Sequence, residues 1–266
     1  MPAFAPHPPR RPTVVTGASS GIGRAIAVAL AAEGHPVALG ARRLDRCEEA
    51  VAAIRADGGE AIALPLDLAD GGSILRFADA ATQALGDIEI VVSNAALNQT
   101  GAVLDTSAEA FEAVLAVNLS GTHRLALALL PGMVERTRGD YVFVTSDVAE
   151  RPRPSMVAYV ASKWGLEGYV RALQMELEGT GVRATVLRPG PTVTDMGMDW
   201  DPVETGRVIE EWASWGFARH SNFMRPESVA EAVVAAVSLP RGTQATTVEL
   251  QPEAPIQKPT VQEDPR

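Results

Sequence analysis

The chain has 266 residues, of which 46% are hydrophobic and 21% are charged, and its formal net charge is −10. This length and composition predict an ordinary globular protein with room for one large domain. The acidic balance argues against nucleic acid and anionic membranes as partners, because both select positively charged surfaces.

Residues 1–11 are rich in proline and precede the first apolar run. They lack the apolar centre of a signal peptide, so we expect a flexible lead-in and a cytoplasmic protein. No apolar run reaches the ~18 residues that a membrane-spanning helix needs. Cys47 is the single cysteine, which leaves neither a disulfide framework nor a thiolate cluster, and we expect no metal.

Short apolar runs rich in β-branched residues alternate with helical patterns along the chain. Strands are expected at residues 13–16, 36–39, 61–64, 88–92, 141–144, 183–187 and 246–250. Helices are expected at residues 22–33, 44–56 and 226–237, with Gly34 and Gly58 as stop signals after the first two. A capping box from Thr106 to Glu109 opens a further helix that runs towards Leu130.

Repeated strand–helix units of this length predict a parallel sheet with helices on both faces. The chain contains no internal repeat, linker or break in composition. We therefore expect one doubly wound α/β domain over residues 12–252, followed by a tail at residues 253–266.

The turn between the first strand and the first helix carries three glycines, Gly17, Gly21 and Gly23. In this context they permit a tight turn, close approach of a pyrophosphate and close helix packing, and the helix N-terminus attracts the phosphate. The same residues spell the G-x-S-x-G pattern of a hydrolase around Ser19. A hydrolase needs several strands before that serine, whereas a Pro-rich segment and one strand precede this one, so we reject that interpretation.

The end of the second strand indicates the choice of coenzyme. A site for NAD usually carries Asp or Glu there to hold the ribose hydroxyls, whereas this chain has Ala41. Arg42 can form charge-assisted bonds with a 2′-phosphate, which favours NADP over NAD. Arg43 either assists or begins a solvated helix face. Asp67, after the third strand, either accepts from the adenine amino group or caps a turn, and we favour the former.

Ser146, Tyr159 and Lys163 can bring three proton-handling groups into one small volume. On a helix, Tyr159 and Lys163 lie one turn apart on the same face, with Cβ atoms about 6 Å apart. An ammonium at that distance favours ionisation of a phenol. For the Tyr–Lys spacing alone, a tyrosine packed in a core and a lysine in water is the alternative, and the remaining motifs argue against it.

Taken together, these motifs resemble the short-chain dehydrogenase/reductase family over about residues 13–250. The glycine turn is followed, in order and at compatible spacing, by Ser93-Asn94-Ala95-Ala96, Ala158 to Lys163, and Pro189 to Met196. The resemblance implies a Rossmann fold with seven parallel strands in the order 3-2-1-4-5-6-7. It also implies an oxidoreductase in which a nicotinamide coenzyme exchanges a hydride with an alcohol or a ketone or aldehyde.

The resemblance assigns a role to each of four catalytic residues. Tyr159 would be the general acid in reduction and the general base in oxidation, its pKa lowered by Lys163 and the oxidised nicotinamide. Lys163 would also hold the nicotinamide ribose, and Ser146 would orient the carbonyl oxygen. Asn118 would kink its helix and hold a water that links Lys163 to solvent.

The resemblance further implies which residues bind the coenzyme. Besides Tyr159 and Lys163, these are Gly17, Ser19, Ser20, Gly21, Ile22, Gly23, Arg42, Arg43, Asp67, Leu68, Asn94, Ala95, Ala96, Pro189, Gly190, Thr192 and Thr194. Two of these positions depart from the family pattern. Ala96 replaces a glycine, and Ser20 stands where many NADP-using members carry a basic residue.

Residues 196–225 would cover the nicotinamide as a substrate lid. This segment contains Met196, Met198, Trp200, Trp212, Trp215, Phe217, Phe223 and Met224. Such side chains suit a bulky hydrophobic ketone or alcohol, or else pack the lid onto the domain or a partner subunit. Asp147 and residues 155–157 are expected to line the same pocket. The resemblance also implies a homotetramer or a homodimer.

Two rival functions use the same fold. A non-catalytic dinucleotide-binding sensor or scaffold would have no need of the hydroxyls of Ser146 and Tyr159. A nucleotide-sugar epimerase or dehydratase would normally need a longer substrate domain than the residues after Gly190 provide. Both observations favour the oxidoreductase.

Overall fold

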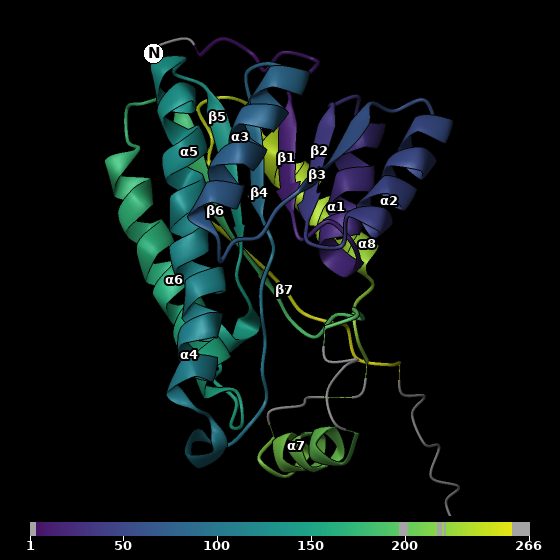
Figure 1. Ribbon diagram of the computed structural model, residues 1–266, viewed down its shortest axis with the longest axis vertical. Coiled ribbons are helices and arrows are strands. Elements are labelled where there is room, and N and C mark those ends of the chain that lie inside the picture. Colours follow the sequence, from purple (N-terminus) through teal and green to yellow (C-terminus); the bar gives the residue numbers. More distant parts are fainter. Residues whose placement is uncertain (1–3, 197–201, 217–219, 221, 257–266) are drawn as a thin grey trace, which may run out of the picture.

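The computed structural model describes residues 4–196, 202–216, 220 and 222–256. At its centre lies a seven-stranded parallel sheet in the order β3-β2-β1-β4-β5-β6-β7, which confirms the predicted topology (Figure 1). The strands are β1 (Thr13–Thr16), β2 (Val37–Ala41), β3 (Ala61–Pro65), β4 (Ile90–Ser93), β5 (Gly139–Val144), β6 (Val182–Pro189) and β7 (Thr247–Leu250).

Helices cover both faces of the sheet. Helices α1, α2 and α8 share one hydrophobic cluster with the strands, and α3, α5 and α6 share the other. The helices are α1 (Gly21–Ala32), α2 (Leu44–Ala56), α3 (Gly71–Leu85), α4 (Ala108–Leu115), α5 (Thr122–Glu135), α6 (Val157–Glu176), α7 (Pro202–Ser214) and α8 (Pro226–Ser238). Three short segments complete the described elements: the 3-10 turns η1 (Val103–Asp105) and η3 (Asp147–Ala149), and the π-helical segment η2 (Ala116–Gly121).

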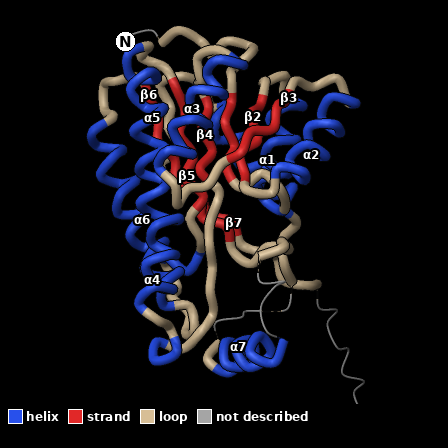
Figure 2. The backbone as a smooth tube through the Cα atoms, viewed as in Figure 1, coloured by secondary structure: helices blue, strands red, loops and turns tan. Residues whose placement is uncertain are grey.

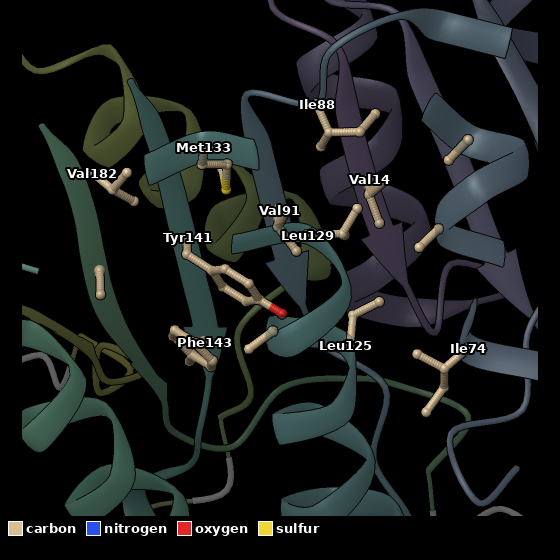
Figure 3. Packing of buried hydrophobic residues seen from close by; sticks show 14 of the residues in the cluster. Val14, Ile74, Ile88, Val91, Leu125, Leu129, Met133, Tyr141, Phe143 and Val182 are labelled. Atoms are coloured by element: carbon tan, nitrogen blue, oxygen red, sulfur yellow. The ribbon is translucent and has the colours of Figure 1, made fainter. Parts of the chain in front are cut away.

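The two clusters follow from the period of two in a β-strand, which sends successive side chains to opposite faces. In β5, Tyr141 and Phe143 face the cluster under α3, α5 and α6, whereas Val142 and Val144 face the cluster under α1 and α8. The rings of Tyr141 and Phe143 stack with centroids 4.3 Å apart (Figure 3). Burial on both faces explains why the central strands β1, β2, β4 and β5 are rich in apolar residues.

The helix expected to open at Thr106 begins later than predicted. Ser107 is its N-cap, and its hydroxyl accepts a hydrogen bond from the Ala110 N–H at 3.1 Å. The Thr106 hydroxyl instead donates to the carbonyl of Ala102 at 3.0 Å, across the turn η1. The preceding 3-10 turn therefore takes Thr106 out of the capping position.

Helix α4, segment η2 and helix α5 form one continuous run, Ala108–Glu135, that is long enough to cross a membrane and contains an 18-residue window with a mean hydropathy of 1.4. In the structure, Val114, Leu125 and Met133 of this run are fully buried inside the protein. A core helix passes the same test of length and composition, so this run is weak evidence for a membrane segment.

Two residues of the proline-rich lead-in, His7 and Arg11, contact the rest of the protein. Arg11 is 2% exposed, forms ion pairs with Glu89 and Asp140, and donates to the Val237 carbonyl at 2.9 Å. His7 lies 3.1 Å from the Leu239 carbonyl. These contacts hold the end of the lead-in close to the amino ends of β4 and β5.

The start of the C-terminal tail lies beside the segment after α7. His220 Nε2 is 3.1 Å from the Pro252 carbonyl, and Asn222 donates to the Glu253 carbonyl at 3.0 Å. The rest of the tail, residues 257–266, lies outside the described residues.

Candidate active site

The carboxyl ends of the strands open on a cavity of about 2150 Å³. Residues of the loops after β1, β2, β3, β4, β5 and β6 and of α7 line this cavity. Helix α7 lies beyond the carboxyl ends of the strands (Figure 2). Every residue predicted to bind the coenzyme lines this cavity, from Gly17 to Thr194, and so does Ser146. Asn118 does not line it.

The glycine turn lies under one end of the cavity. Gly17 and Gly21 have φ of +66° and +52°, a region that favours glycine. A Cβ atom on Gly23 would lie 2.4 Å from the Gly17 carbonyl oxygen and 2.5 Å from Asn94 Nδ2. Ser20 is the N-cap of α1 but its side chain makes no capping bond, so free N–H groups and the positive end of the helix dipole are available to an anion.

Arginines from α2 and its N-cap stand beside the glycine turn. Arg43 donates to Ser19 Oγ at 3.1 Å and to Ser20 Oγ at 2.9 Å, so Arg43 reaches back over the turn rather than only into solvent. Arg46 lines the cavity and pairs with Asp195 at 2.9 Å. Arg46, which the sequence did not single out, lies three residues after the N-cap Arg43 and hence near it in the first turn of α2.

Asp67, in the loop after β3, takes the turn-capping role considered for it, and its contact with adenine stays a prediction. Its Oδ1 accepts from the Ala69 N–H at 2.9 Å, which is the turn-capping role, and its side chain also lines the cavity. After β4, Asn94 donates to the carbonyl of Thr16 at 3.0 Å and so braces the glycine turn.

Ser146, Tyr159 and Lys163 lie together on the opposite wall. Ser146 follows β5, and the other two lie one turn apart on α6; they are 9%, 7% and 2% exposed. Lys163 Nζ lies 5.6 Å from the centroid of the Tyr159 ring and donates to the Val144 carbonyl at 2.8 Å. The spacing in the sequence therefore does place a phenol, a hydroxyl and an ammonium in one space.

The pKa of Tyr159 differs from the sequence-based expectation. Burial raises it to about 12, and Asp147 also raises it, while Ser146 and Arg153 oppose this rise. Burial lowers the pKa of Lys163 to about 8, and Glu167 opposes that shift. At neutral pH the phenol therefore keeps its proton, because burial has the largest effect on its pKa.

The structure shows where Asn118 lies in its helix and which groups its side chain contacts. It lies in the π-helical segment η2, so the helix is irregular at this residue, as predicted. Its carboxamide, however, bonds the backbone of Leu97 in both directions, at 2.7 and 2.9 Å, and donates to Ser162 Oγ at 2.9 Å. The side chain thus ties the loop after β4 to α6.

Residues 11–205 match the family model described as short chain dehydrogenase. The chain belongs to the short-chain dehydrogenase family. This match covers the glycine turn, the strand-end loops and the Ser–Tyr–Lys wall.

Known relatives of this short-chain dehydrogenase include a curated fungal protein and several solved structures. The glycine betaine reductase of Emericella nidulans is 34% identical over 90% of this chain, which spans 18% of that protein's length. An alcohol dehydrogenase of the archaeon Thermococcus sibiricus, complexed with 5-hydroxy-NADP, superposes with a TM-score of 0.79 at 32% identity, covering 93% of this chain and all of that one. An actinorhodin polyketide ketoreductase with NADPH superposes with a TM-score of 0.78 at 26% identity, covering 91% and 95% of the two chains.

Apolar residues from the loop before α6, from α7 and from the segments flanking α7 also line the dehydrogenase cavity. Met156, Met196, Val208, Ile209, Trp212 and Phe223 line it. Of the residues expected there, Asp147 and Met156 are in the wall, whereas Ser155, Val157, Trp215 and Met224 are not. Met198, Trp200 and Phe217 lie outside the described residues.

Two charged residues of the loop before α6, Arg151 and Arg153, also line the dehydrogenase cavity and were not identified from the sequence. Arg153 lines the wall and forms an ion pair with Asp147. In the sequence, the surrounding Arg-Pro-Arg-Pro segment resembles a solvated loop. The expected place of Asp147 in the pocket wall was the signal that a positively charged partner could lie nearby.

Replacement of Gly23 by Ala is expected to raise the Kd for NADPH at least tenfold. The new Cβ would overlap the Gly17 carbonyl, so the turn must shift by more than a side-chain rotation allows. Titration of NADPH fluorescence measures the change. Gly168→Ala in α6 is the matched control, because nothing lies within 4 Å of its Cβ position and the affinity should be unchanged. Equal affinities in both variants would contradict the assignment of the turn.

Proposed function

We propose that this dehydrogenase uses NADP(H) to interconvert a hydrophobic ketone or aldehyde and the corresponding alcohol. One observation carries the proposal: the glycine turn and the Ser146, Tyr159 and Lys163 wall line the same cavity. A coenzyme bound at the turn and a carbonyl at the phenol could thus meet in one space. The similarity to the archaeal alcohol dehydrogenase and the polyketide ketoreductase supports this reaction class.

The residues present fit a phosphorylated dinucleotide. The glycine turn leaves space that any Cβ would fill, and the N-terminus of α1 lacks an acidic residue in its first turn. Arg42, Arg43 and Arg46 supply positive charge where a 2′-phosphate would lie, and Ala41 offers no carboxylate to hold ribose hydroxyls. These features support NADP over NAD, as do the NADP complexes of the similar structures.

Replacement of Arg43 by Ala is expected to raise the Kd for NADPH about tenfold and to leave the Kd for NADH nearly unchanged. The reason is that one charge-assisted bond to a phosphate contributes about 1.5–3 kcal/mol. Fluorescence titration with both coenzymes measures the difference. Arg55→Ala, at the other end of α2, is the control and should bind both like the wild type. A similar loss for NADH and NADPH would contradict a 2′-phosphate contact.

The proton chemistry follows from the wall residues. Because burial holds the pKa of Tyr159 at about 12, the phenol is protonated at neutral pH and can donate to a carbonyl oxygen during reduction. Ser146 supplies a second donor to the same oxygen, and the Lys163 ammonium stabilises the phenolate that remains. The coenzyme, when bound, supplies the hydride. Oxidation needs the phenolate, so its rate should rise with pH over the range in which the fold is stable.

The substrate is a hydrophobic carbonyl compound or secondary alcohol. Its contacts would be the apolar wall formed by Met156, Val208, Ile209 and Trp212. Residues 196–225 then act as the lid, since α7 in this segment supplies three of these side chains. The proposed catalytic domain spans residues 12–252, and residues 253–266 form a tail.

Measuring NADPH oxidation with a broad panel of ketones and aldehydes tests the function. Hydrophobic ketones should be turned over with NADPH in preference to NADH, and small polar carbonyls should be poor substrates. The alternative, a non-catalytic sensor of the same fold, predicts coenzyme binding without turnover of any compound. Turnover of small polar carbonyls alone would contradict the hydrophobic substrate class.

We also propose a cytoplasmic homotetramer or homodimer. Helices α5 and α6 carry large apolar side chains on the surface of the described chain, with Leu127, Trp164 and Met175 being 61%, 52% and 75% exposed. Such side chains on neighbouring helices are the kind of surface that a second copy covers. The small-molecule substrate remains the main partner.

A further inference from the structure

A buried ion pair stands directly beside Ser146. Asp147, the next residue, is 3% exposed, and the Arg153 side chain is 12% exposed. Arg153 Nη1 donates to Asp147 Oδ1 at 3.0 Å, and Nη2 donates to the other carboxylate oxygen. A bidentate guanidinium–carboxylate pair of this kind is both strong and geometrically specific.

The carboxylate of this pair also contacts the serine hydroxyl. Ser146 Oγ donates to Asp147 Oδ1 at 3.3 Å. Asp147 therefore competes for the proton that Ser146 would otherwise offer to a carbonyl oxygen. Among the charged groups near the phenol, Asp147 raises the pKa of Tyr159 and Arg153 lowers it, while burial has the largest effect. The Lys163 ammonium is the other charge close to the Tyr159 ring.

The guanidinium of the pair extends to α7. It lies 5.5 Å from the centroid of the Trp212 ring, and Trp212 Nε1 donates to the Pro154 carbonyl at 3.1 Å. Ser155 Oγ donates to Glu211 of the same helix at 3.2 Å. Trp212 also packs against the small cluster of Val148, Met156 and Tyr159. The loop that carries Arg153 therefore both pairs with Asp147 and contacts α7.

We propose that Asp147 and Arg153 form a positioning pair that links the seating of α7 to the orientation of Ser146 and Tyr159. With Arg153 on both of its oxygens, Asp147 is a weak acceptor, and Ser146 can turn its proton to the carbonyl. Without Arg153, the bare carboxylate retains the serine proton and disfavours the phenolate. The Trp212 ring, 5.5 Å from the guanidinium, holds Arg153 over the carboxylate. The inference rests on the proposed function.

Replacement of Arg153 by Met tests the pair. It should lower kcat about ten- to hundredfold with little change in the Kd for NADPH. Without Arg153, the Asp147 carboxylate retains the proton that Ser146 would donate to the carbonyl oxygen in the transition state. The pH profile of alcohol oxidation should move to higher pH by about one unit. The double variant Arg153→Met with Asp147→Asn should recover most of kcat and the original profile, because the unpaired charge is gone. Trp212→Ala should move the profile in the same direction, with a two- to fivefold loss of kcat, about the strength of one cation–π contact.

The matched control is an exposed arginine–aspartate pair, Arg76 with Asp70, whose side chains are 74% and 57% exposed. Arg76→Met should keep the wild-type kcat and pH profile. An unchanged profile in Arg153→Met, or a double variant as impaired as the single one, would overturn the role of the pair while leaving the proposed function intact. A wild-type protein that binds NADPH but turns over no carbonyl compound would overturn the proposed function and this inference together.

Discussion

Replacement of Tyr159 by Phe is expected to lower kcat for ketone reduction about a thousandfold while leaving the Kd for NADPH unchanged. The phenol is the buried acid of the cavity, with a pKa of about 12, and phenylalanine keeps the ring but removes the proton. Loss of a general acid costs about 10²–10⁴ in rate. Steady-state NADPH oxidation with a hydrophobic ketone measures the effect, and fluorescence titration measures coenzyme binding.

Tyr169→Phe is the matched control for this experiment. Tyr169 lies on the same helix α6, but its hydroxyl contacts His123 at 3.2 Å and it does not line the cavity. Its replacement should leave kcat near the wild-type value. Wild-type turnover by Tyr159→Phe would show that the proton comes from another group.

Replacement of Arg11 by Met is expected to have the largest effect on stability, about 3–5 kcal/mol in the free energy of unfolding. Arg11 is 2% exposed and pairs with Asp140 and with Glu89, so the variant leaves carboxylates buried with fewer positive charges. Asp140 would retain Arg183 at 2.6 Å, and Glu89 would retain Arg138 at 2.5 Å. The variant therefore removes one member of this network of ion pairs and leaves the other pairs in place. Thermal and denaturant unfolding measure it.

Arg10→Met is the control, because the preceding arginine pairs with Glu60 on the surface, with side chains 51% and 55% exposed. An exposed pair contributes about 0–1 kcal/mol, so this variant should unfold nearly like the wild type. Equal stabilities of the two variants would contradict the anchoring of the lead-in by Arg11.

The sheet was predictable because each strand and turn has a recognisable local sequence pattern. Gly17, Gly21 and Gly23 stand between an apolar run and a helical pattern, and the order of such units along the chain restricts the topology. The Tyr159–Lys163 spacing similarly determines a local geometry on one helix. For these features, neighbouring residues in the sequence carry the information.

Features that depend on distant contacts were not predictable in the same way. Arg11 looks like part of a polar lead-in until Asp140, 129 residues later, supplies its partner. The pKa of Tyr159 depends on how completely the folded chain removes it from water, which the spacing to Lys163 does not reveal. Arg153 acquires its role from Trp212 on α7, and Thr106 loses the capping role to Ser107 because of the turn before it.

We propose above all that a proton from Tyr159 and a hydride from the coenzyme reach one carbonyl group in this cavity. Incubation of the protein with NADPH deuterated at the transferred position and a hydrophobic ketone, followed by mass spectrometry of the product, tests it most directly. The account predicts an alcohol that carries the deuterium on its carbinol carbon, formed by the wild type and by Tyr169→Phe but hardly by Tyr159→Phe. Coenzyme binding with no labelled alcohol from any ketone of the panel would contradict it.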